Sequence, residues 1–184
     1  MMIALEGPKA VGKSTLTAGL DGNGIVVMEG FSLTPLQEPD EDTFCQNQAL
    51  YIRQKIEQLR SLREATDYLI VRGPENILHY TLYYPLIKHK KWNVQEKLQD
   101  EIAELRQFKS DRILYLNASQ ECLLERAHLD PKKQRVALTQ WLNDWYEPLY
   151  RYFSHIPYSF ILNTECMTPD EVKAFTISLF TEER

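Results

Sequence analysis

The chain has 184 residues, of which 43% are hydrophobic, 11% aromatic and 26% charged. This length and apolar fraction favour a single domain over residues 1–184 with a sizeable core, and they exclude extensive disorder. The 21 basic and 26 acidic residues give a formal net charge of −5, which argues against a nucleic-acid track as the partner. A local cationic pocket for a small anion remains compatible with this balance, because net charge describes the whole surface.

The cysteines and the apolar runs exclude two further classes. Cys45, Cys122 and Cys166 lie far apart and form no Cys-x-x-Cys pair, so we expect no structural zinc site and a reducing compartment. The sequence contains no run of about 18 apolar residues, so we expect no membrane-spanning helix. A charged residue and a glycine, Glu6 and Gly7, interrupt the apolar N-terminal run too early for a signal peptide. We therefore expect a cytoplasmic protein.

Short apolar runs alternate with helical patterns along the chain. The runs at 2–6, 25–28, 68–71, 113–116 and 159–162 are predicted strands. Helices are predicted over 13–20, about 44–63, 75 to just before Pro85, 94–108, from 119 through 124, 138–153 and 169–180, and a loop is predicted over 31–42. This alternation indicates a three-layer α/β/α domain with a five-stranded parallel sheet and a ligand beyond the carboxyl ends of its strands.

Two apolar stripes have helical spacing. We interpret the stripe at Trp141, Trp145, Leu149 and Phe153 as core. The stripe from Val94 to Leu105 fits either core or a dimer face.

The strongest motif directly follows the first predicted strand. Six of the seven glycines lie in the first 30 residues, and two of them belong to a complete match to G-x-x-x-x-G-K-[ST], formed by Gly7, Pro8, Lys9, Ala10, Val11, Gly12, Lys13 and Ser14. Such a loop points backbone N–H groups at phosphates, and the following helix, entered through Thr15, adds a positive partial charge. Lys13 is predicted to reach the β- and γ-phosphates, and the Ser14 hydroxyl to ligate Mg²⁺.

The phosphate loop alone does not fix the reaction. The chain contains no Asn-Lys-x-Asp guanine signature, which argues against a switch GTPase. The predicted strands ending at Val71 and Leu116 are followed by Arg72 and Asn117, so neither supplies the acid of a motor ATPase. We therefore favour a small-molecule kinase using ATP, although GTP as donor stays open.

Several short segments, in the right order, resemble the deoxynucleoside kinases and thymidylate kinases. Leu5-Glu6-Gly7 before the loop is similar to the family's opening. Glu29 stands where the deoxynucleoside kinases carry a catalytic Glu, and Arg72 with Tyr80 eight residues later is similar to the segment after the family's acid-Arg motif. Further matches are 124–126 with the basic turn through Arg135, and 162–164.

The resemblance implies a sheet of strand order 2-3-1-4-5, a short lid over about 127–136, often a homodimer, and phosphoryl transfer from ATP with Mg²⁺. It implies that Glu29 is the general base or positions the acceptor hydroxyl, and that Arg72 contacts the acceptor or the transferred group. Arg126 and Arg135 would close over the developing charge. Asn163 and Thr164 would line the adenine.

One position departs from the family pattern, because Val71 replaces the acid that precedes Arg72. Glu75 would substitute for it only if the turn at Gly73 and Pro74 folds it back.

Aromatic residues after Arg72 supply a candidate acceptor site. Of Tyr80, Tyr83, Tyr84 and Trp92, we expect Tyr80 to stack on a base. Lys9 is predicted either to add charge near the phosphates or to face water. The basic residues Lys132, Lys133 and Arg135 fit a mobile lid or a solvated surface.

The leading hypothesis is Mg²⁺- and ATP-dependent phosphorylation of a deoxynucleoside, favoured by Glu29. The first alternative is a nucleoside monophosphate kinase of thymidylate kinase type, which needs further cations in the acceptor pocket, such as Arg53 or Arg72. A protein that binds ATP without catalysis, suggested by Val71, and a kinase for an unrelated metabolite also fit the phosphate loop.

Overall fold

The computed structural model describes residues 1–20, 22–30, 40–129 and 138–181. Its sheet contains the strands β1 (Met2–Glu6), β2 (Ile25–Met28), β3 (Asp67–Val71), β4 (Arg112–Asn117) and β5 (Ser159–Asn163). All neighbouring pairs are parallel and the order is β2-β3-β1-β4-β5, which confirms the predicted topology. The apolar strand β1 lies at the centre, where Leu5 pairs with Val71 on one side and Leu114 on the other.

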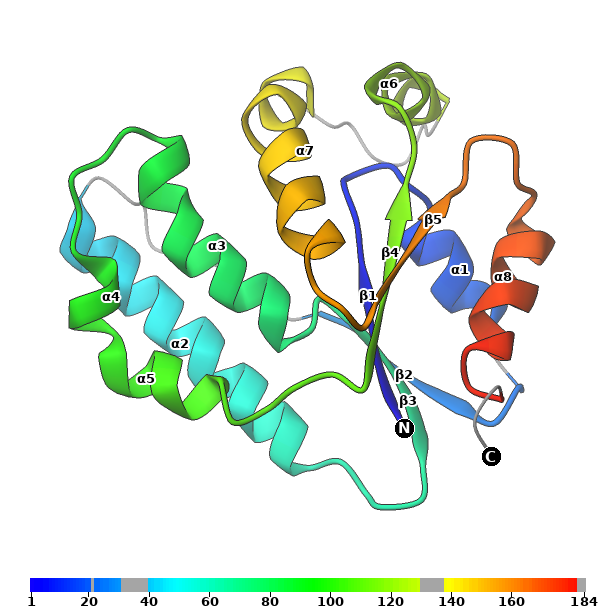
Figure 1. The fold of residues 1–184 in the computed structure, drawn as a ribbon, viewed down its shortest axis with the longest axis horizontal. Coiled ribbons are helices and arrows are strands. Elements are labelled where there is room, and N and C mark those ends of the chain that lie inside the picture. Colours follow the sequence, from blue (N-terminus) through cyan, green and yellow to red (C-terminus); the bar gives the residue numbers. More distant parts are fainter. Residues whose placement is uncertain (21, 31–39, 130–137, 182–184) are drawn as a thin grey trace.

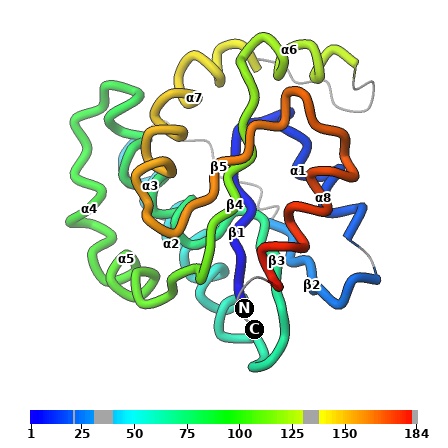
Figure 2. The backbone as a smooth tube through the Cα atoms, turned by 45° about the vertical axis from the view of Figure 1, so that its right-hand side comes forward, coloured from blue at the N-terminus to red at the C-terminus, as the bar shows by residue number. Residues whose placement is uncertain are grey.

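Helices cover both faces of this sheet (Figures 1 and 2). They are α1 (Lys13–Gly19), α2 (Glu41–Arg60), α3 (Pro74–Ile87), α4 (Val94–Lys97), α5 (Gln99–Leu105), α6 (Gln120–His128), α7 (Leu138–Ser154) and α8 (Pro169–Ser178). Helices α1 and α8 pack on one face, and α2, α3, α5 and α7 on the other. None of the helices over the described ranges combines the length and apolarity that crossing a membrane requires.

Two predicted helices differ in extent from those in the structure, one at Leu98 and one at Pro85. The predicted helix over 94–108 is divided at Leu98, whose backbone leaves helical geometry (φ −115°, ψ 25°). Val94, Leu98, Ile102 and Leu105 are all buried against other elements of this chain, so this stripe is core.

Helix α3 was predicted to end before Pro85 but continues to Ile87. A proline removes one helical N–H, and its ring usually kinks a helix. The Pro85 ring is buried, so its packing offsets that cost.

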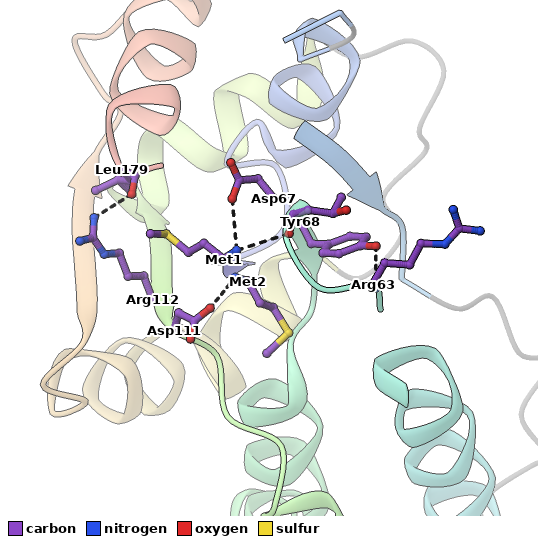
Figure 3. A network of polar contacts seen from close by, with 9 residues as sticks. Met1, Met2, Arg63, Asp67, Tyr68, Asp111, Arg112 and Leu179 are labelled. Atoms are coloured by element: carbon purple, nitrogen blue, oxygen red, sulfur yellow. Dashed lines mark hydrogen bonds and ion pairs between the residues drawn. The ribbon is translucent and has the colours of Figure 1, made fainter. Parts of the chain in front are cut away.

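Backbone and side-chain contacts tie the strands together at their amino ends (Figure 3). The Met1 amino group lies 3.1 Å from Asp67 Oδ1, and the Met2 N–H donates to Asp111 Oδ2 (2.6 Å). The Arg112 guanidinium donates to the Leu179 carbonyl (2.7 Å) and attaches the end of α8 to β4. These three contacts belong to the amino edge of the sheet, and the opposite, carboxyl edge carries the phosphate loop.

At the carboxyl edge, a buried carboxyl joins β1 to the turn between β3 and α3. Glu6 is 1% exposed and accepts hydrogen bonds from the Gly73 N–H (2.6 Å) and from Asn76 Nδ2 (2.7 Å). Burial raises the pKa of Glu6 to about 8, against the opposing effect of the Gly73 N–H. The turn approaches β1 so closely that a Cβ at Gly73 would lie 2.6 Å from the Ala4 Cβ.

We expect Gly73→Ala to lower the free energy of unfolding by roughly 1–3 kcal/mol, because the added methyl overlaps Ala4. The Gly73 φ of −64° suits any residue, so the loss comes from the clash alone. Gly19→Ala is the control, because its Cβ would meet nothing closer than Lys173 Cδ at 3.8 Å. The control should be neutral or gain about 0.5–1 kcal/mol in urea unfolding. Equal behaviour of the two variants would contradict the close packing of this turn.

The raised pKa of Glu6 makes stability depend on pH. The folded carboxyl holds its proton more tightly than the unfolded one, so its contribution is complete below about pH 4.5 and is lost as pH rises through about 8. Glu6→Gln carries no such proton, and its free energy of unfolding should fall less steeply than that of the unsubstituted chain between pH 5 and 8. Urea titrations at several pH values measure the slope. Glu104→Gln, at a surface ion pair with Arg60, is the control and should keep the original slope.

Candidate active site

The loop over residues 7–12 connects β1 to α1 at the carboxyl edge of the sheet, and the motif ends in the first turn of α1 with Lys13 and Ser14. Gly7 has φ +128°, and a Cβ there would lie 2.3 Å from the Leu116 carbonyl oxygen, so only glycine fits. Gly12 also has positive φ (+103°) and is the N-cap of α1. Lys13 Nζ donates to the Gly7 and Pro8 carbonyls at 2.6 and 2.7 Å. The Lys13 side chain therefore folds back over the start of the loop.

A cavity of about 820 Å³ opens above this loop. Residues 9–16 form one wall, and the rest is contributed by residues from the ends of other strands and from α6 and α8: Arg72, Leu116, Arg126, Leu129, Thr164, Met167, Pro169 and Val172. We call it the donor cavity. Its volume suits a small-molecule ligand, and its base is the phosphate loop.

A second cavity of about 390 Å³ lies on the other side of the loop, between α2, α3 and α7. It is lined by Gly7, Lys9, Lys13, Gly30, Gln48, Tyr51, Lys55, Arg72, Asn76, Ile77, His79, Tyr80, Trp141, Trp145 and Leu149. We call it the acceptor cavity. Tyr80 stacks on Trp145 with ring centroids 4.9 Å apart and an interplanar angle of 17°. These flat faces suit a planar ligand ring.

Three cationic residues, Lys9, Lys13 and Arg72, line both cavities. Lys9 Nζ also lies 5.1 Å from the centroid of the Trp141 ring, which extends from α7. An anionic group passing from one cavity to the other would therefore remain beside positive charge.

Arg72 follows β3 in a left-handed backbone conformation (φ +60°). A non-glycine residue in this region costs energy and persists only where its surroundings hold it. Here the Arg72 N–H donates to the Leu5 carbonyl (3.2 Å), and the next N–H, of Gly73, donates to Glu6. The strained residue is thus fixed from β1.

Arg126 and Thr164, predicted from separate segments, are brought together at the donor cavity. The Arg126 guanidinium donates to Thr164 Oγ1 (2.9 Å) and to the Thr164 carbonyl (2.6 Å). Thr164 is in turn bonded to the Asn117 carbonyl at the end of β4. Asn163 lies next to it but is exposed, and its Oδ1 accepts from the Glu165 N–H.

Other predicted residues lie apart from the cavities. The Glu29 side chain is exposed and does not line either cavity, although Gly30 beside it does. Arg53 lies 2.7 Å from Glu101 in an ion pair, outside both cavities. Arg135 and residues 130–136 of the predicted lid lie outside the described residues, as does the basic pair Lys132 and Lys133.

Glu75 does not fill the place of the missing acid at Val71. Its carboxylate accepts from the Ser110 N–H and hydroxyl, both at 2.9 Å, and it lines neither cavity. The turn at Gly73 directs Glu75 into the core beneath the site, where it joins α3 to the start of β4.

The acceptor cavity contains polar residues that the sequence reasoning did not select, including Gln48, Lys55 and His79. His79 is buried, which lowers its pKa to about 4, and it stacks on Tyr83 with centroids 4.5 Å apart. Lys55 interrupts the buried side of α2 between Ile52 and Leu59. Because Lys55 has the same helical phase as these apolar residues, the sequence could have identified it as a buried lysine.

Trp145, Leu149 and Phe153 are buried, which confirms the core interpretation of the α7 stripe. The same stripe also forms a wall of the acceptor cavity through Trp141, Trp145 and Leu149. One face of α7 thus both packs in the core and lines this cavity.

The donor cavity also suits a magnesium nucleotide. Ser14 lines it next to Lys13, and a serine hydroxyl is a hard oxygen ligand. Within the described ranges, no three His, Cys, Asp or Glu residues gather to hold a metal ion. This donor set fits a Mg²⁺ ion that is bound mainly through phosphate oxygens and water.

No protein-family model matches the chain, and no curated protein sequence matches it. Solved structures do match it. A deoxyadenosine kinase from M. mycoides with dCMP and a flexible dCDP bound has a TM-score of 0.67 and 18% identity, covering 100% of both chains. A thymidylate kinase from Candida albicans has a TM-score of 0.64 and 16% identity, covering 98% of this chain and 91% of that one.

A third structure, the YorR protein from Bacillus subtilis in complex with phosphorylated GDP, has a TM-score of 0.58 and 17% identity, covering 100% of this chain and 97% of that one. These similarities extend over the whole chain and agree with its phosphate loop and its strand order. The chain therefore has the fold of the P-loop nucleoside and nucleotide kinases.

Proposed function

We propose that this protein is a kinase that transfers the γ-phosphoryl group of ATP to a nucleoside or a nucleotide. The observation that carries the proposal is the meeting of two cavities at Lys9, Lys13 and Arg72, directly over a phosphate loop. Structures of the same fold include a deoxyadenosine kinase and a thymidylate kinase, which supports this class of acceptor.

In the donor cavity, the loop amides and Lys13 would hold the triphosphate of ATP, with residues 7–15 around it. Thr164 and Arg126 line the far part of this cavity and would contact the adenosine, with Asn163 beside them. Ser14 would ligate Mg²⁺ together with phosphate oxygens. When bound, the ion neutralises charge on the phosphates.

In the acceptor cavity, the stacked pair of Tyr80 and Trp145 would pack beside the base, and Arg72 would contact the transferred group as charge develops on it. Catalysis by these residues is mainly positioning and electrostatic stabilisation, because phosphoryl transfer asks for little covalent chemistry from the protein. For a hydroxyl acceptor, Glu29 would have to reach the cavity from its place next to Gly30. Arg135 would complete the charge neutralisation together with Arg126.

We expect Lys13→Ala to lower transfer to the acceptor by at least about 10²–10³-fold, because it removes one of the three cations that line both cavities and the one that would hold the phosphates. ADP release in the presence of a panel of nucleosides and monophosphates measures this, and thermal unfolding verifies that the variant is folded. Lys109→Ala is the matched control, because Lys109 lies over the Tyr158 ring and lines neither cavity. Unchanged turnover in Lys13→Ala would contradict the proposal. Tight ATP binding without turnover on any acceptor would instead favour a non-catalytic ATP-binding protein.

A further inference from the structure

We propose that Lys9 exchanges between two partners: its ammonium lies on the Trp141 ring in this structure and moves to a phosphate group when a triphosphate occupies the donor cavity. Binding in the donor cavity thereby changes the wall of the acceptor cavity. This inference rests on the proposed function in taking a triphosphate as the donor. The observation behind it is a cation–π contact between the phosphate loop and α7.

Lys9 is an exposed residue of the phosphate loop that lines both cavities. Its Nζ lies 5.1 Å from the centroid of the Trp141 ring, within the range of a cation–π contact. This ring is one of the groups with which Lys9 interacts. Because a lysine ends in a compact ammonium on a flexible aliphatic chain, the ammonium can reach a second partner while the backbone stays in place.

The backbone around Lys9 is held by the fold. A Cβ at Gly7 would lie 2.3 Å from the Leu116 carbonyl oxygen, so the loop is packed directly against the end of β4. Ala10, the residue after Lys9, has a left-handed conformation (φ +68°), which a residue other than glycine keeps only where its surroundings hold it. An exchange of partners is therefore a movement of the Lys9 side chain alone.

The Trp141 ring is held in place as well. It lies in the first turns of α7, packs against two clusters of the hydrophobic core and lines the acceptor cavity. Trp145 and Leu149 of the same helix form other parts of that wall. Departure of the Lys9 ammonium therefore leaves the ring where it is and makes more of its face available to a ligand in the acceptor cavity.

A phosphate is the stronger partner for this ammonium. An exposed cation–π contact stabilises less than a charge-assisted hydrogen bond to a phosphate oxygen, so an anion over the loop draws the ammonium from the ring. Lys13 and Arg72 line the same junction, and their positive charge also favours an anion there. Because ring and phosphate compete for one ammonium, removal of the ring tightens phosphate binding and removal of the ammonium weakens it.

Equilibrium titrations of the full chain test this exchange without any need for turnover. Inorganic tripolyphosphate and ATP, each with Mg²⁺, are titrated by calorimetry into the unsubstituted protein, Lys9→Met, Trp141→Leu and Lys90→Met. Lys90 is the matched control, because it is exposed, its Nζ lies 5.7 Å from the centroid of the Trp92 ring, and it lines neither cavity. Thermal unfolding verifies that each variant is folded.

We expect Trp141→Leu to tighten the binding of both probes by about two- to fivefold, because the ring no longer competes for the ammonium. Lys9→Met should weaken their binding by about tenfold, and Lys90→Met should bind them as the unsubstituted protein does. Trp141→Phe keeps a weaker π face, so it should tighten binding less and in the same direction. It replaces Trp141→Leu if that variant does not fold.

Tryptophan fluorescence gives a second readout, because the departure of a cation from an indole face changes the emission of that indole. Saturating tripolyphosphate should change the emission of the unsubstituted protein and of Lys90→Met. The change should be lost in Lys9→Met and in Trp141→Leu, although Trp92 and Trp145 remain in both variants.

Unchanged or weaker phosphate binding in Trp141→Leu and Trp141→Phe would overturn the exchange and leave the kinase proposal standing. Unchanged binding in Lys9→Met, or an emission change that persists in it, would overturn the exchange as well. Binding of both probes without ADP release on any acceptor would overturn the proposed catalysis, while the same titrations would still decide whether Lys9 exchanges its partners. Absence of binding of both probes would overturn the two proposals together.

Discussion

The buried carboxyl of Glu6 is the constraint on which the site depends. It ends the central strand and accepts the Gly73 N–H and the Asn76 amide, so the turn after β3 is held against β1. The phosphate loop begins one residue after Glu6, and Arg72 comes one residue before Gly73. One carboxyl therefore sets the distance between the loop that carries Lys13 and the strained turn that carries Arg72. Both cations come to line both cavities through this junction.

Although the protein is acidic, its two cavities have cationic linings. The formal charge of −5 is distributed over the whole chain, whereas Lys9, Lys13, Lys55 and Arg72 converge on the acceptor cavity. Burial and low dielectric strengthen the effect of such a cluster on a ligand. The net charge therefore describes the surface as a whole, and local geometry determines the charge that lines a cavity.

The features that were predictable from the sequence are local or periodic. The five strands are short apolar runs, and the phosphate loop is a contiguous motif whose backbone requirements select glycine. The resemblance to known kinases supplied the strand order, which the structure confirms. Arg72, Tyr80 and Thr164, which follow strands β3 and β5, line the cavities, and their roles stay predictions.

The features that were not predictable depend on contacts distant in sequence. Glu75 bonds Ser110, so it turns away from the site, and no pattern near residue 75 contains that information. The break at Leu98 and the continuation of α3 through Pro85 are likewise decided by packing. Lys55 is a different case: its phase with the buried side of α2 could have identified it, but a lysine on a helix ordinarily lies on exposed surface and it was not selected.

The central claim is that the two cavities hold the two substrates of one transfer, with the phosphoryl group passing between Lys13 and Arg72. A crystal structure with a bisubstrate analogue, in which adenosine and a nucleoside are joined by a phosphate chain, tests this most directly. The account predicts adenosine in the donor cavity, the second nucleoside beside Tyr80 and Trp145, and the bridging phosphates within hydrogen-bond distance of Lys13 and Arg72. An analogue bound wholly in the donor cavity, with the acceptor cavity vacant, would contradict it.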